Sequence, residues 1–368
     1  MNIGFVLGTS EGGTVRHVAM LARGCAGLGL DARVFGPAST REYVHGIAFE
    51  AAAIGGRPHP VSDTAAMRRL RELLMAMNAD VVHAHGMRAG ALAALALRPF
   101  AGSRPAAAAR WPGHRPPALV VTVHNAPPAG TSAALVYGLL ERLVAANADV
   151  VLCVSSDLSA RMRALGAEVV GRAIVPAPAL AASGRRPADL PGDRPIILAV
   201  GRLAPQKGFG TLINAAARWR DRLPEPLVVI AGAGPLAGAL TEQATGLGAD
   251  VRLLGRRDDI ADLLAAADVF ALPSTWEGQP LILQEAMRAC RPIVASDVGG
   301  VSDLTGDDGA LLVGPGDPAA LAAAVLSVLD DLGLASRLSK AAAQRAAALP
   351  TESDAIAASV DLYRRLRQ

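Results

Sequence analysis

Short apolar runs alternate with amphipathic stretches from one end of this 368-residue chain to the other. The runs are continuous and consist mainly of Val, Leu, Ile and Ala. Strands need this composition when helices cover both faces of a parallel sheet. Strands are expected at 3–7, 32–35, 80–84, 119–124, 150–154 and 173–175, and helices at 14–28, 64–77, 89–97, 132–146 and 156–165. This order predicts a doubly wound α/β domain in the first half.

A polar segment rich in proline and glycine, residues 181–194, interrupts the alternation and is predicted to be a linker. The alternation then restarts, with strands expected at 196–200, 227–231, 251–254, 269–272 and 293–295, and helices at 210–219, 235–247, 260–266, 281–289 and 318–329. The stretch 334–367 is predicted to be helical except at Pro350. We therefore expect two similar domains, 1–180 and 195–350, a cleft between them, and a last helix at 351–368. Ligands of such sheets bind beyond the carboxyl ends of the strands.

Composition and charge argue against a nucleic-acid-binding protein and against a membrane-spanning one. The net charge is only +3 and the basic residues are scattered, so the pI near 9.0 does not indicate a nucleic-acid partner. Met1 to Gly8 enters a predicted strand without a basic leader, and no apolar run approaches the ~20 residues of a membrane span. These features predict a cytoplasmic protein. The three cysteines, Cys25, Cys153 and Cys290, are expected to be buried free thiols.

A basic loop follows the predicted strand 196–200, with the sequence Gly201-Arg-Leu-Ala-Pro-Gln-Lys-Gly208. Lys207 is one of only two lysines among 36 basic residues, the other being Lys340. Lysine at such a position indicates a site that needs a compact charge on a flexible stem, whereas Arg202 offers a planar fork for phosphate oxygens. Together they are predicted to neutralise a diphosphate and stabilise it as a leaving group.

Two glutamates, Glu277 and Glu285, lie eight positions apart across a predicted loop-to-helix junction. Glu285 should lie on a helix that has Pro280 in its first turn, and its carboxylate can accept two hydroxyl hydrogen bonds, as a ribose requires. Glu277 precedes that helix, where the free N–H groups of the first turn also point. Gly278 and Leu281, between the glutamates, are counted among the predicted binding residues. Two cations and two carboxylates at strand ends suit a nucleotide sugar.

The first half offers weaker signals. Gly12 and Gly13 follow a strand and open a helix, where the backbone can approach a phosphate or sugar closely, although a plain tight turn has the same sequence. His85 and His124 each end a predicted strand. Both are expected to project into the same cleft, and a structural role for either histidine stays open.

One glycine turn has two interpretations. Gly234, in Ala231-Gly-Ala-Gly-Pro-Leu-Ala-Gly238, is predicted to let the backbone face a diphosphate or base. With Arg256 and Arg257 the same segment could be a dinucleotide fingerprint for NADP, but its third glycine is one residue late. A metal site is not predicted, since the sequence lacks Asp-x-Asp and zinc-like spacings. The segment 98–117 is either a solvated loop or a basic flap near the acceptor or a membrane.

Taken together, these motifs resemble the retaining glycosyltransferases of family 4, which have the GT-B fold: two Rossmann-like domains facing each other across a cleft. The resemblance covers the whole chain and is more specific in the second half. The matching segments are 11–13, 80–85, 122–124, 200–208, 231–235, 273–287, 292–300 and 309–317. This sequence departs from the family at Cys290, where glycine is usual, and at Asp303, where glutamate is usual.

The resemblance implies roles for individual residues. Arg202 and Lys207 would hold the donor diphosphate, Glu285 the ribose and Glu277 the donor sugar, while His124 would lie beside the reacting centre. It also implies a last helix that crosses back to pack on the first domain.

The expected function is metal-independent, retaining transfer of a sugar from a UDP- or GDP-sugar to an acceptor hydroxyl, by front-face substitution and with no cofactor. The acceptor could be a glycan, a lipid-linked sugar or a secondary metabolite, and a peripheral membrane contact is left open. Three alternatives remain: an NADP-dependent oxidoreductase, a GT-B-type epimerase or phosphorylase, and a nucleotide-sugar-binding regulator without turnover.

Overall fold

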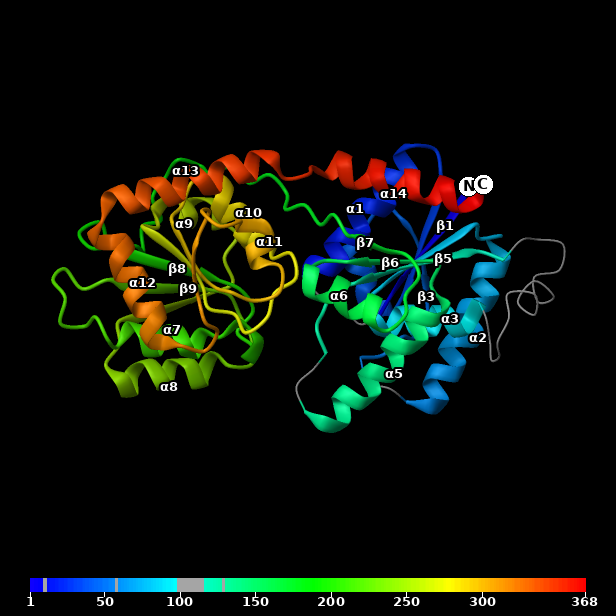
Figure 1. The fold of residues 1–368 in the computed structure, drawn as a ribbon, viewed down its shortest axis with the longest axis horizontal. Helices are drawn as coiled ribbons and strands as arrows, with labels where there is room; N and C mark the ends of the chain where they lie inside the picture. The colour runs from blue at the N-terminus through cyan, green and yellow to red at the C-terminus, as the bar shows by residue number, and fades with distance from the viewer. Residues whose placement is uncertain (9–11, 57–58, 98–115, 128–129) are drawn as a thin grey trace. The chain divides into compact units, whose positions relative to one another are not determined.

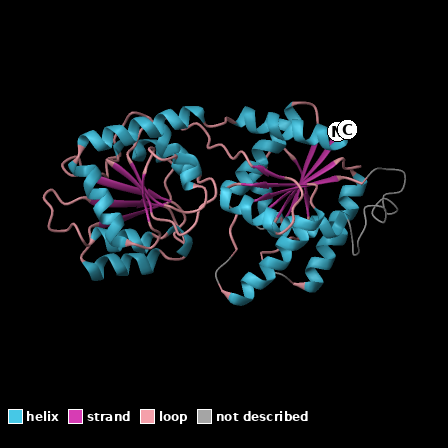
Figure 2. Ribbon diagram, in the orientation of Figure 1, coloured by secondary structure: helices cyan, strands magenta, loops and turns pink. Residues whose placement is uncertain are grey.

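The computed structural model describes residues 1–8, 12–56, 59–97, 116–127 and 130–368. The chain divides into two compact units. Unit 1 comprises Met1–Pro176 and Pro350–Gln368, and unit 2 comprises Ala177–Leu349. Within each unit a single parallel sheet lies between layers of helices (Figures 1 and 2). Glu11 and most of the segment 98–117 lie outside the described residues.

The sheet of unit 1 has the strand order β3-β2-β1-β4-β5-β6-β7, and all of its pairings are parallel. The strands are β1 (Asn2–Leu7), β2 (Asp31–Gly36), β3 (Ala48–Ala51), β4 (Val81–His85), β5 (Ala118–Val123), β6 (Val150–Cys153) and β7 (Val170–Arg172). The order reverses between β1 and β4, and a parallel sheet binds its ligands beyond the carboxyl ends of the strands at such a point.

Helices cover both faces of this sheet. They are α1 (Gly13–Gly27), η1 (Ala38–Tyr43), α2 (Pro60–Ala76), α3 (Met87–Leu97), α5 (Thr131–Asn147), α6 (Ser156–Ala164) and α14 (Glu352–Arg367). The last of them, α14, begins at a capping box formed by Thr351 and Asp354. It buries Val360 and Tyr363 in the same core as α1 and β1. The C-terminal helix is thus part of the core of unit 1.

The sheet of unit 2 repeats this topology, with the order β10-β9-β8-β11-β12-β13 and parallel pairings. Its strands are β8 (Ile196–Val200), β9 (Leu227–Ala231), β10 (Val251–Gly255), β11 (Val269–Leu272), β12 (Ile293–Ser296) and β13 (Leu311–Val313). Its helices are η2 (Pro205–Lys207), α7 (Phe209–Ala216), α8 (Ala237–Leu247), α9 (Ile260–Ala266), α10 (Leu281–Arg288), α11 (Val301–Thr305), α12 (Pro318–Asp330) and α13 (Leu332–Ala348).

Successive residues of β8 explain why the apolar runs are continuous. Ile196 and Leu198 belong to the core on one face of the sheet, and Ile197 and Ala199 to the core on the other. Side chains alternate across a strand, so a sheet covered on both faces needs an apolar residue at every position.

Several predictions about short elements were wrong. The edge strands β3 and β13 were not predicted because they are short and only half-buried. The helix α11 was not predicted because it has only five residues. A strand was expected at 173–175, but β7 ends at Arg172. Cys25 and Cys153 are buried as predicted, whereas Cys290 is exposed. It lies two residues after the end of α10 and has a positive φ of 54°.

Among the residues that the structure describes, no single helix is long and apolar enough to cross a membrane. The pair α12 and α13 passes by length and composition when taken together, but the two helices are bent by 102° at their junction.

Candidate functional site

The carboxyl edge of the second sheet holds the basic loop. β8 ends at Val200, and Arg202 follows before the single turn η2 brings Lys207 to the start of α7. The side chain of Arg202 is exposed and makes no hydrogen bond or ion pair with any described residue. An unpaired guanidinium at the binding edge of a parallel sheet is free to take an anionic ligand.

Lys207 forms an ion pair with Glu277, whose carboxylate is almost completely buried. Its Nζ lies 2.6 Å from Glu277 Oε1, and Ser274 Oγ donates to the same oxygen over 2.6 Å. Glu277 is 5% exposed, and its Oε2 accepts no hydrogen bond from a described residue. The sequence pointed to a cation and a carboxylate serving different parts of a ligand. The structure joins them, with one carboxylate oxygen occupied and the other available.

Backbone contacts between two loops hold this pair in register. Thr275 N donates to Gln206 O over 2.8 Å, and Gln206 Nε2 donates to Trp276 O over 2.9 Å. Gly208 sits between η2 and α7 with φ +63°, and a Cβ at this position would lie 1.9 Å from Pro273 O. Only glycine permits so close an approach of the two loops. The backbone therefore fixes where Lys207 meets Glu277.

Gly234 has a similar packing role. A Cβ at this position would lie 2.5 Å from Leu203 O, so the turn after β9 presses on the loop that carries Arg202. The dinucleotide interpretation relies on two arginines as phosphate ligands. Arg256 is exposed and has no partner among the described residues, whereas Arg257 is already paired. Its Nη1 lies 2.5 Å from Asp189 Oδ2, and its Nε lies 2.7 Å from Asp259 Oδ1. These ion pairs leave that guanidinium unavailable for a 2′-phosphate.

The helix α10 carries the remaining predicted donor ligands. It begins at Leu281, with Pro280 as the N-cap, so the prediction that proline lies inside the first turn was wrong by one residue. Glu285 lies one turn into the helix and is half-buried, Leu281 is also half-buried, and Gly278 is buried before the cap. Glu277 and Glu285 thus flank the N-terminus of α10.

At the carboxyl edge of the first sheet, α1 begins beyond β1. Gly12 is its N-cap residue, with φ +70°, and Gly13 is its first residue. Among the described residues no side chain caps the helix, and its first turn contains no acidic residue. The N–H groups of this turn are therefore left for water or for a ligand.

Two predicted site residues of unit 1 lie in contact. His85 is the last residue of β4 and His124 directly follows β5, and His85 Nδ1 lies 3.1 Å from His124 Nε2. Burial lowers the pKa of His124 to about 3 and that of His85 well below its usual value, with smaller contributions from neighbouring histidines. Both rings are neutral at physiological pH.

Sequence reasoning missed three partners of these histidines: His17 on α1, His83 on β4 and Tyr363 on α14. The ring of His17 lies close to those of His85 and His124, and the ring of His83 lies close to that of His85. The ring of Tyr363 contacts that of His83. One signal was available, because His83 and His85 are two residues apart on a strand and must share a face. Nothing local could have indicated Tyr363, which is 280 positions away from its partner His83.

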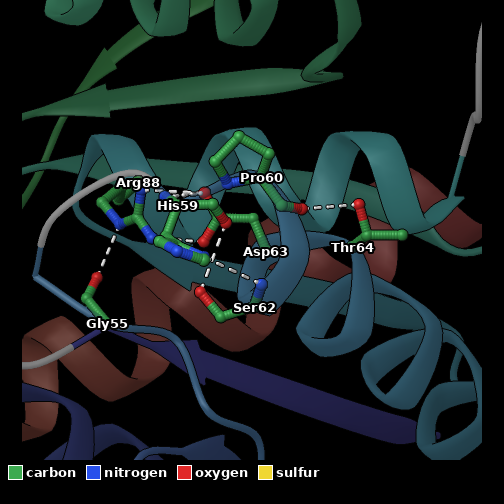
Figure 3. Close-up of polar contacts among 7 residues, drawn as sticks. All are labelled: Gly55, His59, Pro60, Ser62, Asp63, Thr64 and Arg88. Atoms are coloured by element: carbon green, nitrogen blue, oxygen red, sulfur yellow. Dashed lines mark hydrogen bonds and ion pairs between the residues drawn. The ribbon is translucent and has the colours of Figure 1, made fainter.

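A cation near the carboxyl edge of the first sheet, Arg88, has a structural role. Arg88, at the start of α3, donates from Nε to Gly55 O over 2.6 Å, and its Nη2 lies 2.6 Å from Asp63 Oδ1 (Figure 3). Asp63 Oδ2 also accepts from the backbone N–H of His59, the N-cap of α2 (Figure 3). The pair ties the start of α2 to the start of α3, so Arg88 is engaged within the protein, unlike Arg202.

Within the described part of the chain, no group of three or more His, Cys, Asp or Glu side chains is arranged to hold a metal ion. Of the ion pairs between described residues at the two sheet edges, that of Glu277 is made by lysine and those of Asp63 and Asp189 by arginine.

The chain matches known proteins over both halves. Residues 11–176 match the model described as Glycosyltransferase Family 4, and residues 194–331 match Glycosyl transferases group 1, which together cover well over half of the chain. The alpha-D-kanosaminyltransferase of Streptomyces kanamyceticus is 36% identical over 46% of this chain and 44% of its own. The phosphatidyl-myo-inositol mannosyltransferase of Mycolicibacterium smegmatis is 29% identical over 90% of this chain and 85% of its own.

A solved structure of HepE from Anabaena in complex with UDP has a TM-score of 0.78 at 20% identity and covers 99% of this chain and all of its own. The chain spans less than two thirds of the length of the first curated relatives that it matches. The chain therefore belongs to family 4 of the glycosyltransferases, and its two Rossmann-like units have the GT-B fold.

Proposed function

We propose that this protein transfers a sugar from a nucleotide diphosphate sugar to an acceptor hydroxyl, with retention of configuration and without a metal ion. One observation carries the proposal: the unpaired Arg202 and the paired Lys207 and Glu277 lie on loops at the carboxyl edge of one sheet. Two cations suit a diphosphate, and a carboxylate with one open oxygen suits a sugar hydroxyl.

In this account each residue acts on the donor. Arg202 holds diphosphate oxygens with its guanidinium fork, and Lys207 adds a point charge that is held in place by Glu277. Glu277 Oε2 accepts a hydrogen bond from the donor sugar, and Glu285 accepts from the ribose. Gly12 and Gly13 form the uncapped start of α1. The free N–H groups of its first turn favour a negatively charged part of the donor.

The reaction breaks the bond between the anomeric carbon and the diphosphate oxygen, and the electron pair leaves with the diphosphate. The acceptor hydroxyl attacks from the same face, and its proton passes to an oxygen of the departing phosphate. Arg202 and Lys207 lower the barrier because they stabilise charge that grows on the diphosphate in the transition state.

A UDP-sugar donor is supported by the ligands and substrates of similar proteins. HepE has been solved with UDP-glucose, and a relative 30% identical over 65% of this chain is named a UDP-Gal-dependent galactosyltransferase acting on a diphosphoundecaprenol acceptor. We propose a UDP-sugar donor, with a GDP-sugar as the second choice, and a glycan, lipid-linked or secondary-metabolite acceptor. The cytoplasmic location and a peripheral membrane contact stay predictions.

A thermal-shift panel tests the class of ligand. We expect UDP or GDP to raise the unfolding temperature, and NADPH to leave it unchanged, because Gly234 is packed against Leu203 and the pairing of Arg257 leaves only Arg256 for a 2′-phosphate. Stabilisation by NADPH and by neither diphosphate would overturn the proposal in favour of an oxidoreductase.

Retention and metal independence are tested with UDP-glucose and water as the acceptor. We expect UDP release to continue at an unchanged rate in excess EDTA, and proton NMR to show α-glucose as the first sugar formed. β-Glucose as the first product would contradict retention, and loss of UDP release in EDTA would contradict metal independence. A product other than free sugar would indicate an epimerase or phosphorylase.

A further inference from the structure

Six aromatic rings form a cluster in unit 1: Phe5, His17, His83, His85, His124 and Tyr363. Ring centroids lie 4.2 Å apart for His83 and His85, and 5.4 Å apart for His85 and His124. The ring of His17 stands edge-on to those of His85 and His124, at 5.6 and 5.9 Å. His83, His85 and Tyr363 are at most 1% exposed, so the interior of the cluster is closed to solvent.

The hydrogen bonds within the cluster are unevenly distributed. His83 uses both ring nitrogens, with Nδ1 2.5 Å from Tyr363 Oη and Nε2 2.7 Å from Thr122 Oγ1. His85 uses only Nδ1, which lies 3.1 Å from His124 Nε2, and its buried Nε2 has no partner among the described residues. His17 Nδ1 is likewise buried and unpartnered.

This pattern decides which histidine donates. Burial lowers the pKa of His85 and His124, so both rings are neutral and each carries a single N–H. If His124 donated from Nε2, the proton of His85 would sit on its Nε2 as a buried donor with no acceptor. If His85 donates from Nδ1, its Nε2 is a bare acceptor. Buried N–H groups without a partner are the rarer and costlier case, so the second arrangement is favoured.

We propose that His85 is a positioning residue, whose Nδ1–H donates to His124 Nε2 and fixes His124 in the Nδ1–H tautomer. The Nδ1 atom of His124 has no partner among the described residues, and its side chain is only half-buried. His124 therefore presents a hydrogen-bond donor to a sugar hydroxyl, and it cannot act as a base because its lone-pair nitrogen is occupied. This role rests on the proposed function, which places a sugar beside His124.

The groups that hold His85 in place include a residue of the C-terminal helix α14. Tyr363 and Thr122 hold His83 at both ring nitrogens, and the ring of His83 lies against that of His85. His85 is thereby restricted to one ring orientation, and α14 becomes part of the support for His124. A support of this kind keeps a substrate-binding group in its productive geometry.

NMR of the full-length protein labelled with ¹⁵N-histidine tests the tautomer directly. Two-bond proton–nitrogen correlations distinguish the two neutral forms, and the His124→Gln variant assigns the signals. We expect His124 to be protonated at Nδ1, the form that histidine disfavours in water, and His85 to be protonated at Nδ1 as well. A proton on His124 Nε2 would overturn the proposal. This measurement does not depend on any activity of the protein.

Two substitutions of His85 test its positioning role. His85→Asn keeps a donor near the Nδ1 position, whereas His85→Leu fills similar space without one. With UDP-glucose as the probe, we expect UDP release to fall by about tenfold or more in His85→Leu and by less than about threefold in His85→Asn. Binding of UDP should be unchanged in both. His17→Asn is the matched control, since His17 touches the same rings without bonding to them.

Equal losses in His85→Leu and His85→Asn, or none in either, would contradict the positioning role. If His85→Leu does not fold, as judged by thermal unfolding, the tautomer of the wild-type protein still decides the question. If the wild type releases no UDP from UDP-glucose, the donor assignment fails, and the NMR result remains a separate test of the histidine arrangement.

Discussion

The two sheets share one order over six strands, with β7 as an additional strand in unit 1, yet their carboxyl edges differ in charge. In unit 2 that edge carries Arg202, Lys207 and Glu277, with an unpaired guanidinium and a nearly buried ion pair. In unit 1 it carries neutral histidines whose pKa values are lowered by burial, and the cation nearby, Arg88, is bound to Asp63. Repeated topology thus supplies two binding edges. The side chains of unit 2 supply fixed cations for an anionic ligand, whereas those of unit 1 are neutral and leave the N–H groups at the start of α1 for negative charge.

Charge on the second edge should dominate catalysis. We expect Lys207→Ala to lower kcat/KM for UDP release from UDP-glucose by about a thousandfold, or about 4 kcal/mol, because the leaving diphosphate loses a fixed cation. Lys340→Ala is the matched control, since Lys340 is the only other lysine and is exposed on α13. A similar decrease in both variants would remove the contrast between the two edges.

The histidines at the edge of the first sheet should instead make the stability of the folded state depend on pH. His17 has a pKa of about 4, lowered by burial from 6.5, so unfolding takes up a proton between these values. Stability is therefore present above pH 6.5 and lost as the pH falls towards 4, by about 3 kcal/mol for this group alone.

Urea unfolding at a series of pH values measures this loss, and His17→Gln should flatten it. His45→Gln serves as the control, because His45 is an exposed histidine outside the cluster. An unchanged pH dependence in His17→Gln would show that His17 is not held neutral.

Substitutions of Arg202 and Lys207 should affect UDP binding and the free energy of unfolding differently. Arg202 has no partner among the described residues, so Arg202→Ala should change the free energy of unfolding by less than about 0.5 kcal/mol while weakening UDP binding by about 2 kcal/mol. Lys207→Met leaves the Glu277 carboxylate with Ser274 alone and should destabilise the protein by about 1–3 kcal/mol.

The double variant Lys207→Met/Glu277→Gln should recover part of that loss, because no unpaired carboxylate remains. Denaturant unfolding and UDP titration of the same samples provide both values. A large loss of stability in Arg202→Ala would contradict its free state.

The smallest expected effect concerns the end of α10. Cys290 has a φ of 54°, a conformation that glycine adopts at lower cost than other residues. Cys290→Gly should raise the free energy of unfolding by up to about 1 kcal/mol in denaturant titrations, whereas Cys290→Ala should not. Equal effects of the two substitutions would show that the backbone conformation is not the cause.

The sequence was most informative where one signal repeats. Continuous apolar runs predicted the central strands β1, β4, β8 and β9 because both sides of each must be apolar, whereas the half-buried edge strands β3 and β13 lack that signal. The basic loop was found because it directly follows a strand, and the two glutamates because they lie on either side of a loop-to-helix junction.

Pairing between residues distant in the sequence could not be predicted. The bond between Lys207 and Glu277 joins positions 70 apart, and that between His83 and Tyr363 joins positions 280 apart. Whether a predicted ligand residue is free or already paired, as Arg202 and Arg257 illustrate, depends on such packing. The spacing of residues along the chain does not show which side chains are paired in the folded protein.

Calorimetric titration of UDP and of uridine into wild type, Lys207→Ala and Lys340→Ala is the most direct test that the second sheet edge binds a diphosphate. We predict that Lys207→Ala weakens UDP binding by about thirtyfold or more, that uridine binding stays the same, and that Lys340→Ala matches wild type for both ligands. UDP binding that is within about threefold of wild type in Lys207→Ala would contradict the account.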